Sequence, residues 1–162
     1  MYFEANNGQL VATVTPPAGV APIATLQQHL LPPQIGELQR SFAAWATSGM
    51  SPGLVTPART WCNADGRLFF IFEGGHTPQP LTHVGLAREL AAWLVMLDQW
   101  METFVVVARA RSVWRNEELA AALSFMTTAF LPPALATANW QRVAGALAHV
   151  VAEGPLTEVA PQ

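Results

Sequence analysis

Residues 51–81, SPGLVTPARTWCNADGRLFFIFEGGHTPQPL, contain the clearest fold signal in this chain. Two runs in it, LVTPARTWC and RLFFIFE, are rich in β-branched and aromatic residues, which are typical of strands. Between them, Asn63 to Gly66 form a turn sequence, in which glycine supplies a left-handed residue. We therefore expect a β-hairpin. Pro57 cannot donate to a hydrogen-bonded ladder, so its strand should lie at a sheet edge or carry a bulge there.

A second hairpin is predicted at the amino terminus. The runs MYFEA and QLVATVT flank Asn6-Asn7-Gly8, and Asn-Gly tolerates the positive φ of a tight turn. A helix should then occupy residues 34–48, ending near Gly49. Its apolar residues recur at helical spacing and are Ile35, Leu38, Phe42 and Trp45.

Residues 83–113 predict one helix of unusual length, because neither glycine nor proline follows Gly85. The run FVVV at 104–107 favours a strand locally, so residues 101–113 are helix or strand on sequence grounds. On a helical wheel, Asp98 and Glu102 lie together on the polar side, where we expect a solvated pair. The apolar side consists of Leu86, Leu90, Trp93, Leu97, Trp100, Met101 and Phe104.

Two further helices are expected at the carboxy terminus. Asn116 should cap the first, which ends at Leu131-Pro132-Pro133 after an apolar stripe of Leu119, Leu123, Met126 and Phe130. The second should span about 138–152 and stop at Gly154.

Together these patterns predict a single α+β domain over residues 1–154, followed by a short tail at 155–162. Its two β-hairpins should join in a small antiparallel sheet packed against several helices, with a carboxy-terminal helical hairpin. A helical bundle with a small β appendage is the alternative.

Charge is scarce in this chain. Charged residues make up 12% of 162 and apolar residues 51%, whereas charged residues are about 25% of ordinary domains. With so few charges, we expect apolar area on the surface and therefore a protein partner or a homo-oligomer. The net charge of −3, with arginines scattered and no lysine, argues against nucleic acid.

Location follows from the cysteine count and the hydropathy pattern. Cys62 is the only cysteine, so no intrachain disulfide can form. The amino terminus has no basic region or apolar run, so we expect no secretory signal and a cytoplasmic location. No membrane span is expected in the long predicted helix, because its longest uncharged run is Leu90 to Leu97, against about 20 residues needed.

No catalytic, metal or cofactor site is predicted. Cys62 ends a strand with no histidine nearby to activate it, so a small packed hydrophobe is the better interpretation. His76 and His83 flank a proline-rich loop but lack the spacing that metal sites use. We therefore expect a protein that is not an enzyme.

The order of a short helix, a PGLV strand, an Asp-Gly turn, the strand RLFFIFE and a long helix resembles the smaller lobe of protein kinases, over residues 9–100 at most. The resemblance implies that VATV at 11–14 is the third strand, Glu37 the helix-C glutamate and Glu73 the hinge residue. Val14 stands where kinases have their phosphate-binding lysine. Because the Gly-rich loop, the His-Arg-Asp loop and Asp-Phe-Gly are also missing, the resemblance implies a degenerate lobe without catalysis.

The sequence thus favours a non-enzymatic interaction or assembly module that associates through an apolar helical surface. Trp93 and Trp100, seven apart on the predicted long helix, could anchor a partner, since tryptophan is enriched at interfaces. Glu73 and His76 lie on a loop that should be exposed beside that helix. The alternative is a domain that binds a small molecule, with nucleotides among the candidate ligands, or a degenerate kinase-like lobe, which uses a hinge at Phe70 to Gly75.

Overall fold

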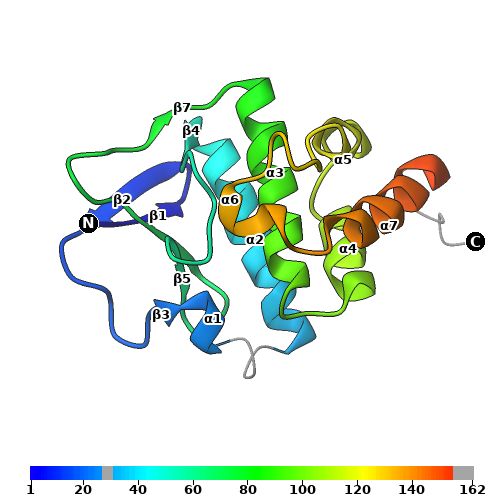
Figure 1. Cartoon of the computed structure of the whole chain (residues 1–162). Coiled ribbons are helices and arrows are strands. Elements are labelled where there is room, and N and C mark those ends of the chain that lie inside the picture. The colour runs from blue at the N-terminus through cyan, green and yellow to red at the C-terminus, as the bar shows by residue number, and fades with distance from the viewer. Residues whose placement is uncertain (27–30, 155–162) are drawn as a thin grey trace, which may run out of the picture.

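The computed structural model describes residues 1–26 and 31–154, and the chain folds as an α+β protein (Figure 1). The predicted tail at 155–162 lies outside the described residues. Within them, the strands form a five-stranded sheet of order β2-β1-β6-β5-β3 and a two-stranded sheet of β4 and β7. The strands are β1 (Tyr2–Asn6), β2 (Gln9–Thr13), β3 (Ala21–Pro22), β4 (Met50–Ser51), β5 (Thr60–Cys62), β6 (Leu68–Ile71) and β7 (Gln79–Pro80).

Apart from the short α1, which lies beside β3 and β5, the helices lie to one side of the larger sheet in Figure 1, with α3 at the centre of the helical part. Their bounds are α1 (Ile23–Leu26), α2 (Pro32–Thr47), α3 (His83–Asp98), α4 (Thr103–Arg111), α5 (Asn116–Leu123), α6 (Pro133–Ala136) and α7 (Trp140–Glu153).

Both hairpins form as predicted, and β1 joins them by pairing antiparallel with β6. Asn7 and Gly8 turn the first hairpin with φ of 51° and 76°, values that match a tight type I′ connection. The expectation for Pro57 was wrong, because residues 57–59 form a turn and β5 begins only at Thr60. A proline before the first residue of a strand removes no ladder hydrogen bond.

The predicted helix over 83–113 is two helices, α3 and α4, with a turn at residues 99–102. The side chain of Asp98 holds this turn, accepting hydrogen bonds from Thr103 Oγ1 and, at 2.7 Å, from Arg142 Nη2 on α7. Asp98 is therefore buried and bonded, not half of a solvated pair with Glu102. Residues 103–111 are helix, and Phe104, expected on the apolar face, is 78% exposed.

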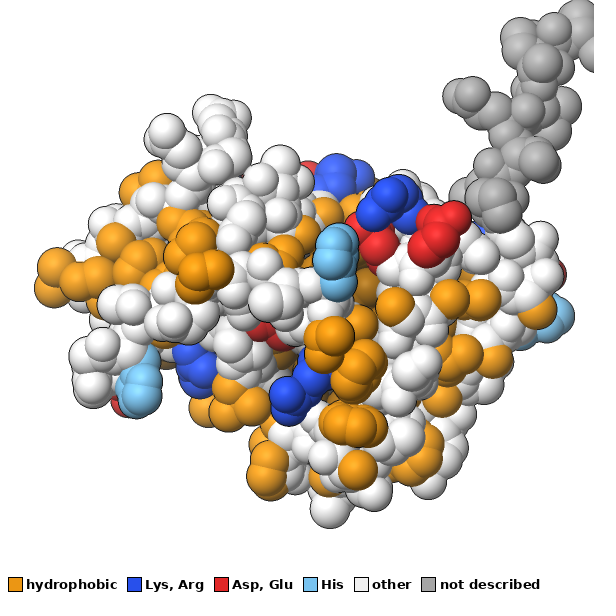
Figure 2. Space-filling view, turned by 90° about the horizontal axis from the view of Figure 1, so that it is seen from above, with side chains coloured by type: hydrophobic (Ala, Val, Ile, Leu, Met, Phe, Trp, Pro, Cys, Tyr) orange, Lys and Arg blue, Asp and Glu red, His pale blue; other side chains and the backbone are white. Residues whose placement is uncertain are grey.

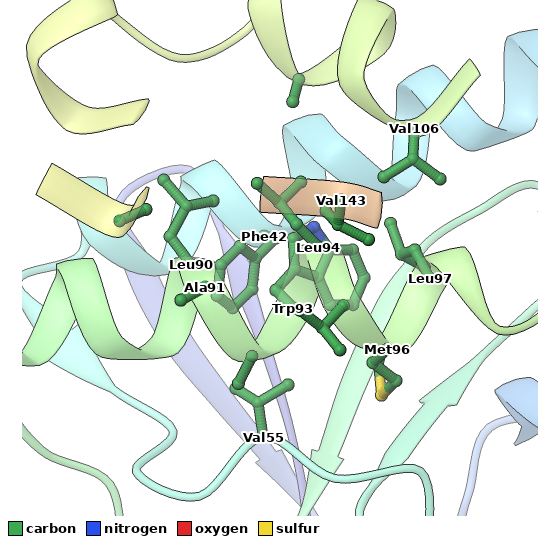
Figure 3. Packing of buried hydrophobic residues seen from close by; sticks show 14 of the residues in the cluster. Phe42, Val55, Leu90, Ala91, Trp93, Leu94, Met96, Leu97, Val106 and Val143 are labelled. Carbon is green, nitrogen blue, oxygen red and sulfur yellow. The ribbon is translucent and has the colours of Figure 1, made fainter. Parts of the chain in front are cut away.

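The core is built around α3, which is buried on all sides along most of its length (Figure 3). Phe42 of α2 stacks on Trp93 of α3, with ring centroids 4.7 Å apart, and packs against Phe70 of β6. Helix α2 therefore lies between the sheet and α3. Gln39 Oε1 accepts the indole N–H of Trp93 at 3.0 Å and that of Trp114 at 3.4 Å.

The carboxy-terminal helices α5 and α7 pack against each other as the predicted helical hairpin. The predicted cap is wrong: Arg115 precedes the helix, and its backbone N–H donates to Glu118 Oε2 at 2.9 Å. Helix α5 ends at Leu123, so Met126 and Phe130 of the predicted stripe lie in the following loop. Within residues 1–26 and 31–154, no helix has the length and hydropathy to cross a membrane.

Candidate functional site

Two hollows flank the loop that joins β4 to β5. The larger, here called the Arg59 cavity, has a volume of about 610 Å³. Its walls are residues 51–53, Ala58 and Arg59, residues 71–73, and His76, Thr77 and Gln79. The β5–β6 hairpin and the β4–β7 pairing bring these four segments together, since Met50 pairs with Pro80 and Thr60 with Phe70.

The Arg59 guanidinium is held in one orientation by the wall of the cavity. It donates three hydrogen bonds to backbone carbonyls: Nε to Ile71 at 3.1 Å, Nη1 to Leu54 at 3.1 Å and Nη2 to Pro52 at 3.2 Å. Its Cζ also lies 4.8 Å from the ring centroid of Phe72, a cation–π contact. Among the residues that the structure describes, these contacts leave two of its five N–H donors unused.

Arg59 is also without a close counter-ion. No carboxylate of the described residues lies within the 4.0 Å of an ion pair. Burial lowers the pKa of Arg59, and the charges of Glu73 and Glu89 raise it in part. The cavity thus holds a fixed, partly desolvated positive charge.

Glu73 and His76, two of the predicted interaction residues, both line this cavity and are exposed. A tight turn joins them, in which Gly74 and Gly75 have φ of 63° and 78° and His76 N–H donates to the carbonyl of Glu73 at 3.2 Å. The structure therefore places them beside Arg59, a residue that sequence reasoning did not single out.

The second hollow, here called the Phe130 face, has a volume of about 400 Å³ and lies between the 53–55 loop, the first turns of α3 and residues 129–133. Two of the residues that line it are exposed and apolar: Leu54 is 49% exposed and Phe130 47%. Arg88, which is exposed, also lines it. Figure 2 looks down on the side of β7 and α3, where apolar side chains gather around separate arginines.

Glu89 lies between the two hollows and was missed by sequence reasoning. It is 6% exposed, and its Oε1 accepts hydrogen bonds from Ser51 Oγ and, at 2.7 Å, from Gly53 N–H. Burial raises the pKa of Glu89 to about 7, against the opposing effects of those two hydrogen bonds and of Arg59 and Arg88. The one indication in the sequence that Glu89 is buried is that eight uncharged residues, Leu90 to Leu97, follow it directly.

The two predicted tryptophan anchors lie elsewhere. Trp93 is fully buried in the core, so the interaction predicted for it is wrong for this fold: it offers no surface to a partner. Trp100 is half-buried in the turn between α3 and α4 and lines neither hollow. The apolar helical surface expected to bind a partner is the core helix α3 itself.

Groups with nucleophilic or metal-binding chemistry are not gathered at either hollow. Cys62 is fully buried in β5, and burial raises the pKa of its thiol to about 12, which disfavours the reactive thiolate. Residues 1–26 and 31–154 contain no group of three or more histidine, cysteine, aspartate or glutamate side chains that could hold a metal ion.

Comparison of the chain with protein-family models, with curated proteins and with solved structures found no match. The resemblance to a kinase lobe stays a prediction. Of the residues it singles out, Glu37 pairs with Arg40 on the exposed side of α2 at 2.8 Å, and Glu73 lines the Arg59 cavity.

Proposed function

We propose that this protein is a non-enzymatic interaction module that self-associates through the Phe130 face. The observation that carries the proposal is the exposure of two large apolar side chains, Leu54 and Phe130, that line one hollow. Large apolar side chains gathered in one place on a surface are typical of interaction sites. This location replaces the helical surface expected from the sequence, because α3 is buried.

A second copy of the chain is the occupant that suits this face. Each copy offers both a half-exposed aromatic ring, Phe130, and a hollow with Ala92, Leu131 and Pro132 in its lining. A surface with both features can pair with itself about a two-fold axis, so that each ring enters the other copy's hollow. Removing the exposed parts of Phe130 and Leu54 from water contributes about 1 kcal/mol for each side chain.

Electrostatics do not oppose this pairing strongly. Arg88 is the one exposed charge among the residues that line the hollow, and Glu89 beside it is buried. A two-fold interface can keep Arg88 at its rim, where water screens it. The scarcity of charge over the whole chain, 12% of residues, favours association in the same way.

The experiment is the solution mass of the chain, from size-exclusion chromatography with light scattering at a low and a high micromolar concentration. We expect a dimer for the unaltered chain and a monomer for Phe130→Ser. Phe104→Ser is the matched control, because Phe104 is 78% exposed on α4 and takes no part in either hollow. A monomer at both concentrations, or a dimer that Phe130→Ser leaves intact, would contradict the proposal.

Phe130 packs edge-on against Phe125, with centroids 5.0 Å apart, so its replacement also removes an internal contact. Leu54→Gln is therefore a second variant on the same face. If both variants are monomeric and melt within a few degrees of the unaltered chain, loss of the dimer reflects the surface and not the fold.

A further inference from the structure

The Arg59 cavity combines a fixed cation with space for a ligand. Its volume of about 610 Å³ lies within the roughly 300–1,000 Å³ typical of small-molecule sites. The three backbone hydrogen bonds and the contact with Phe72 already hold the guanidinium in place. When a ligand pairs with this guanidinium, the Arg59 side chain therefore loses little conformational entropy.

The unused donors define the charged group of the ligand. Two N–H groups remain on the guanidinium of Arg59, and two parallel N–H···O bonds are the pattern in which arginine binds a carboxylate. Glu73 lies on the same cavity, and its negative charge disfavours a second negative charge on the ligand. A monoanion therefore fits better than a phosphate dianion.

The other residues that line the cavity indicate the chemistry of the rest of the ligand. Pro52, Ala58 and Ile71 line it with aliphatic surface beside the guanidinium. Such surface stabilises an apolar group by removing it from water. Polar groups at the mouth, His76 and Thr77, are exposed.

We propose that the Arg59 cavity is a binding site for a small organic monocarboxylate, whose carboxylate pairs with the two free donors of Arg59 and whose apolar body lies against Pro52, Ala58 and Ile71. The site shares Ser51 and Gly53 with the Phe130 face but does not depend on self-association. It involves no covalent step.

The test uses isothermal titration calorimetry with benzoate and hexanoate as probes, and inorganic phosphate and AMP as comparison ligands. We expect saturable binding of a carboxylate probe, and weaker or no binding of the two phosphates. Arg59→Gln should weaken carboxylate binding at least about tenfold, because it removes the charge-assisted pair. Arg109→Gln, which removes an exposed arginine that likewise has no ion pair among the described residues, should leave binding unchanged.

Arg59→Gln also removes hydrogen bonds to the wall, so a second variant keeps the test independent of folding. Glu73→Gln alters an exposed side chain and should strengthen carboxylate binding about threefold, because it removes a nearby like charge. Absence of saturable binding of both carboxylates would overturn the proposal. So would phosphate or AMP binding as tightly as the carboxylates, or a carboxylate affinity that neither variant changes.

Discussion

Glu89 makes the stability of this protein depend on pH in a way that a single substitution should abolish. Its carboxylate is buried between the two hollows and accepts hydrogen bonds from Ser51 and Gly53. Glu89→Gln preserves a side-chain oxygen that can accept both bonds but removes the titrating proton. The comparison between the two proteins therefore isolates the carboxyl group.

The size of the effect follows from the pKa. Burial raises the pKa of Glu89 from 4.5 to about 7 in the folded chain. Between these two values the folded chain holds a proton that the unfolded chain releases, so the free energy of unfolding falls as pH rises. The contribution is fully present below the unfolded pKa and is lost above the folded one. At 1.36 kcal/mol for each pKa unit, the whole loss is about 3 kcal/mol, with about 2 kcal/mol of it between pH 5 and pH 7.5.

The assay is urea unfolding of both proteins across that pH range. We expect the stability of Glu89→Gln relative to the unaltered chain to increase by about 2 kcal/mol from about pH 5 to about pH 7.5. Glu117→Gln, at an exposed carboxyl in the first turn of α5, serves as the control and should show no such increase. A difference that stays within about 0.5 kcal/mol over the whole range would show that the Glu89 carboxyl is not desolvated.

Three other substitutions or reactions test the core and the hairpin. Gln39→Leu should cost about 2–4 kcal/mol in urea unfolding, because Trp93 and Trp114 lose their shared acceptor, and a loss below about 1 kcal/mol would contradict that role. Gly66→Ala should lower the melting temperature by at least about 5 °C, since φ is 87° and a Cβ would lie 2.5 Å from a backbone oxygen of α2; an unchanged midpoint would refute this. Cys62 should react with a thiol reagent only as fast as the chain unfolds, because it is buried with its pKa raised to about 12, and immediate labelling of the folded protein would count against this environment.

The features that sequence reasoning placed correctly depend on neighbouring residues. Asn7 and Gly8 adopt positive φ in the first hairpin, and Gly66 does so in the second, as their residue types favour. The helix predicted over 34–48 is α2, where Ile35, Leu38, Phe42 and Trp45 are all buried. In each case the signal lies within a few residues of the feature.

The errors arose where distant segments meet. Nothing near residue 100 is a glycine or proline, yet the helix stops there, because Asp98 bonds to Thr103 and to Arg142 on α7. A helical wheel assigns each residue of a helix to a solvent-facing or a core-facing side. Helix α3 is covered by several elements at once, so Trp93 and Glu89 are both buried. A helical pattern carries no information on how many neighbours will cover it.

Sequence reasoning identified two residues of the candidate site but not its central residue. Glu73 and His76 were chosen for their loop, and they do line a cavity, but the residue that gives the cavity its charge is Arg59. Arg59 lies in a predicted strand segment with no distinguishing motif. Its role appears only when the backbone carbonyls of Pro52, Leu54 and Ile71 accept hydrogen bonds from its guanidinium.

The two hairpins, the α+β class and the positions of α2 and α7 could be predicted from the sequence, because turn chemistry and helical periodicity act over a few residues. The end of α3 and the desolvation of Glu89, Asp98 and Arg59 depend on the tertiary structure. Desolvation depends on which elements cover a side chain, and those elements come from sequence positions as far apart as Asp98 and Arg142. The physical properties of both hollows are therefore consequences of packing and not of any local motif.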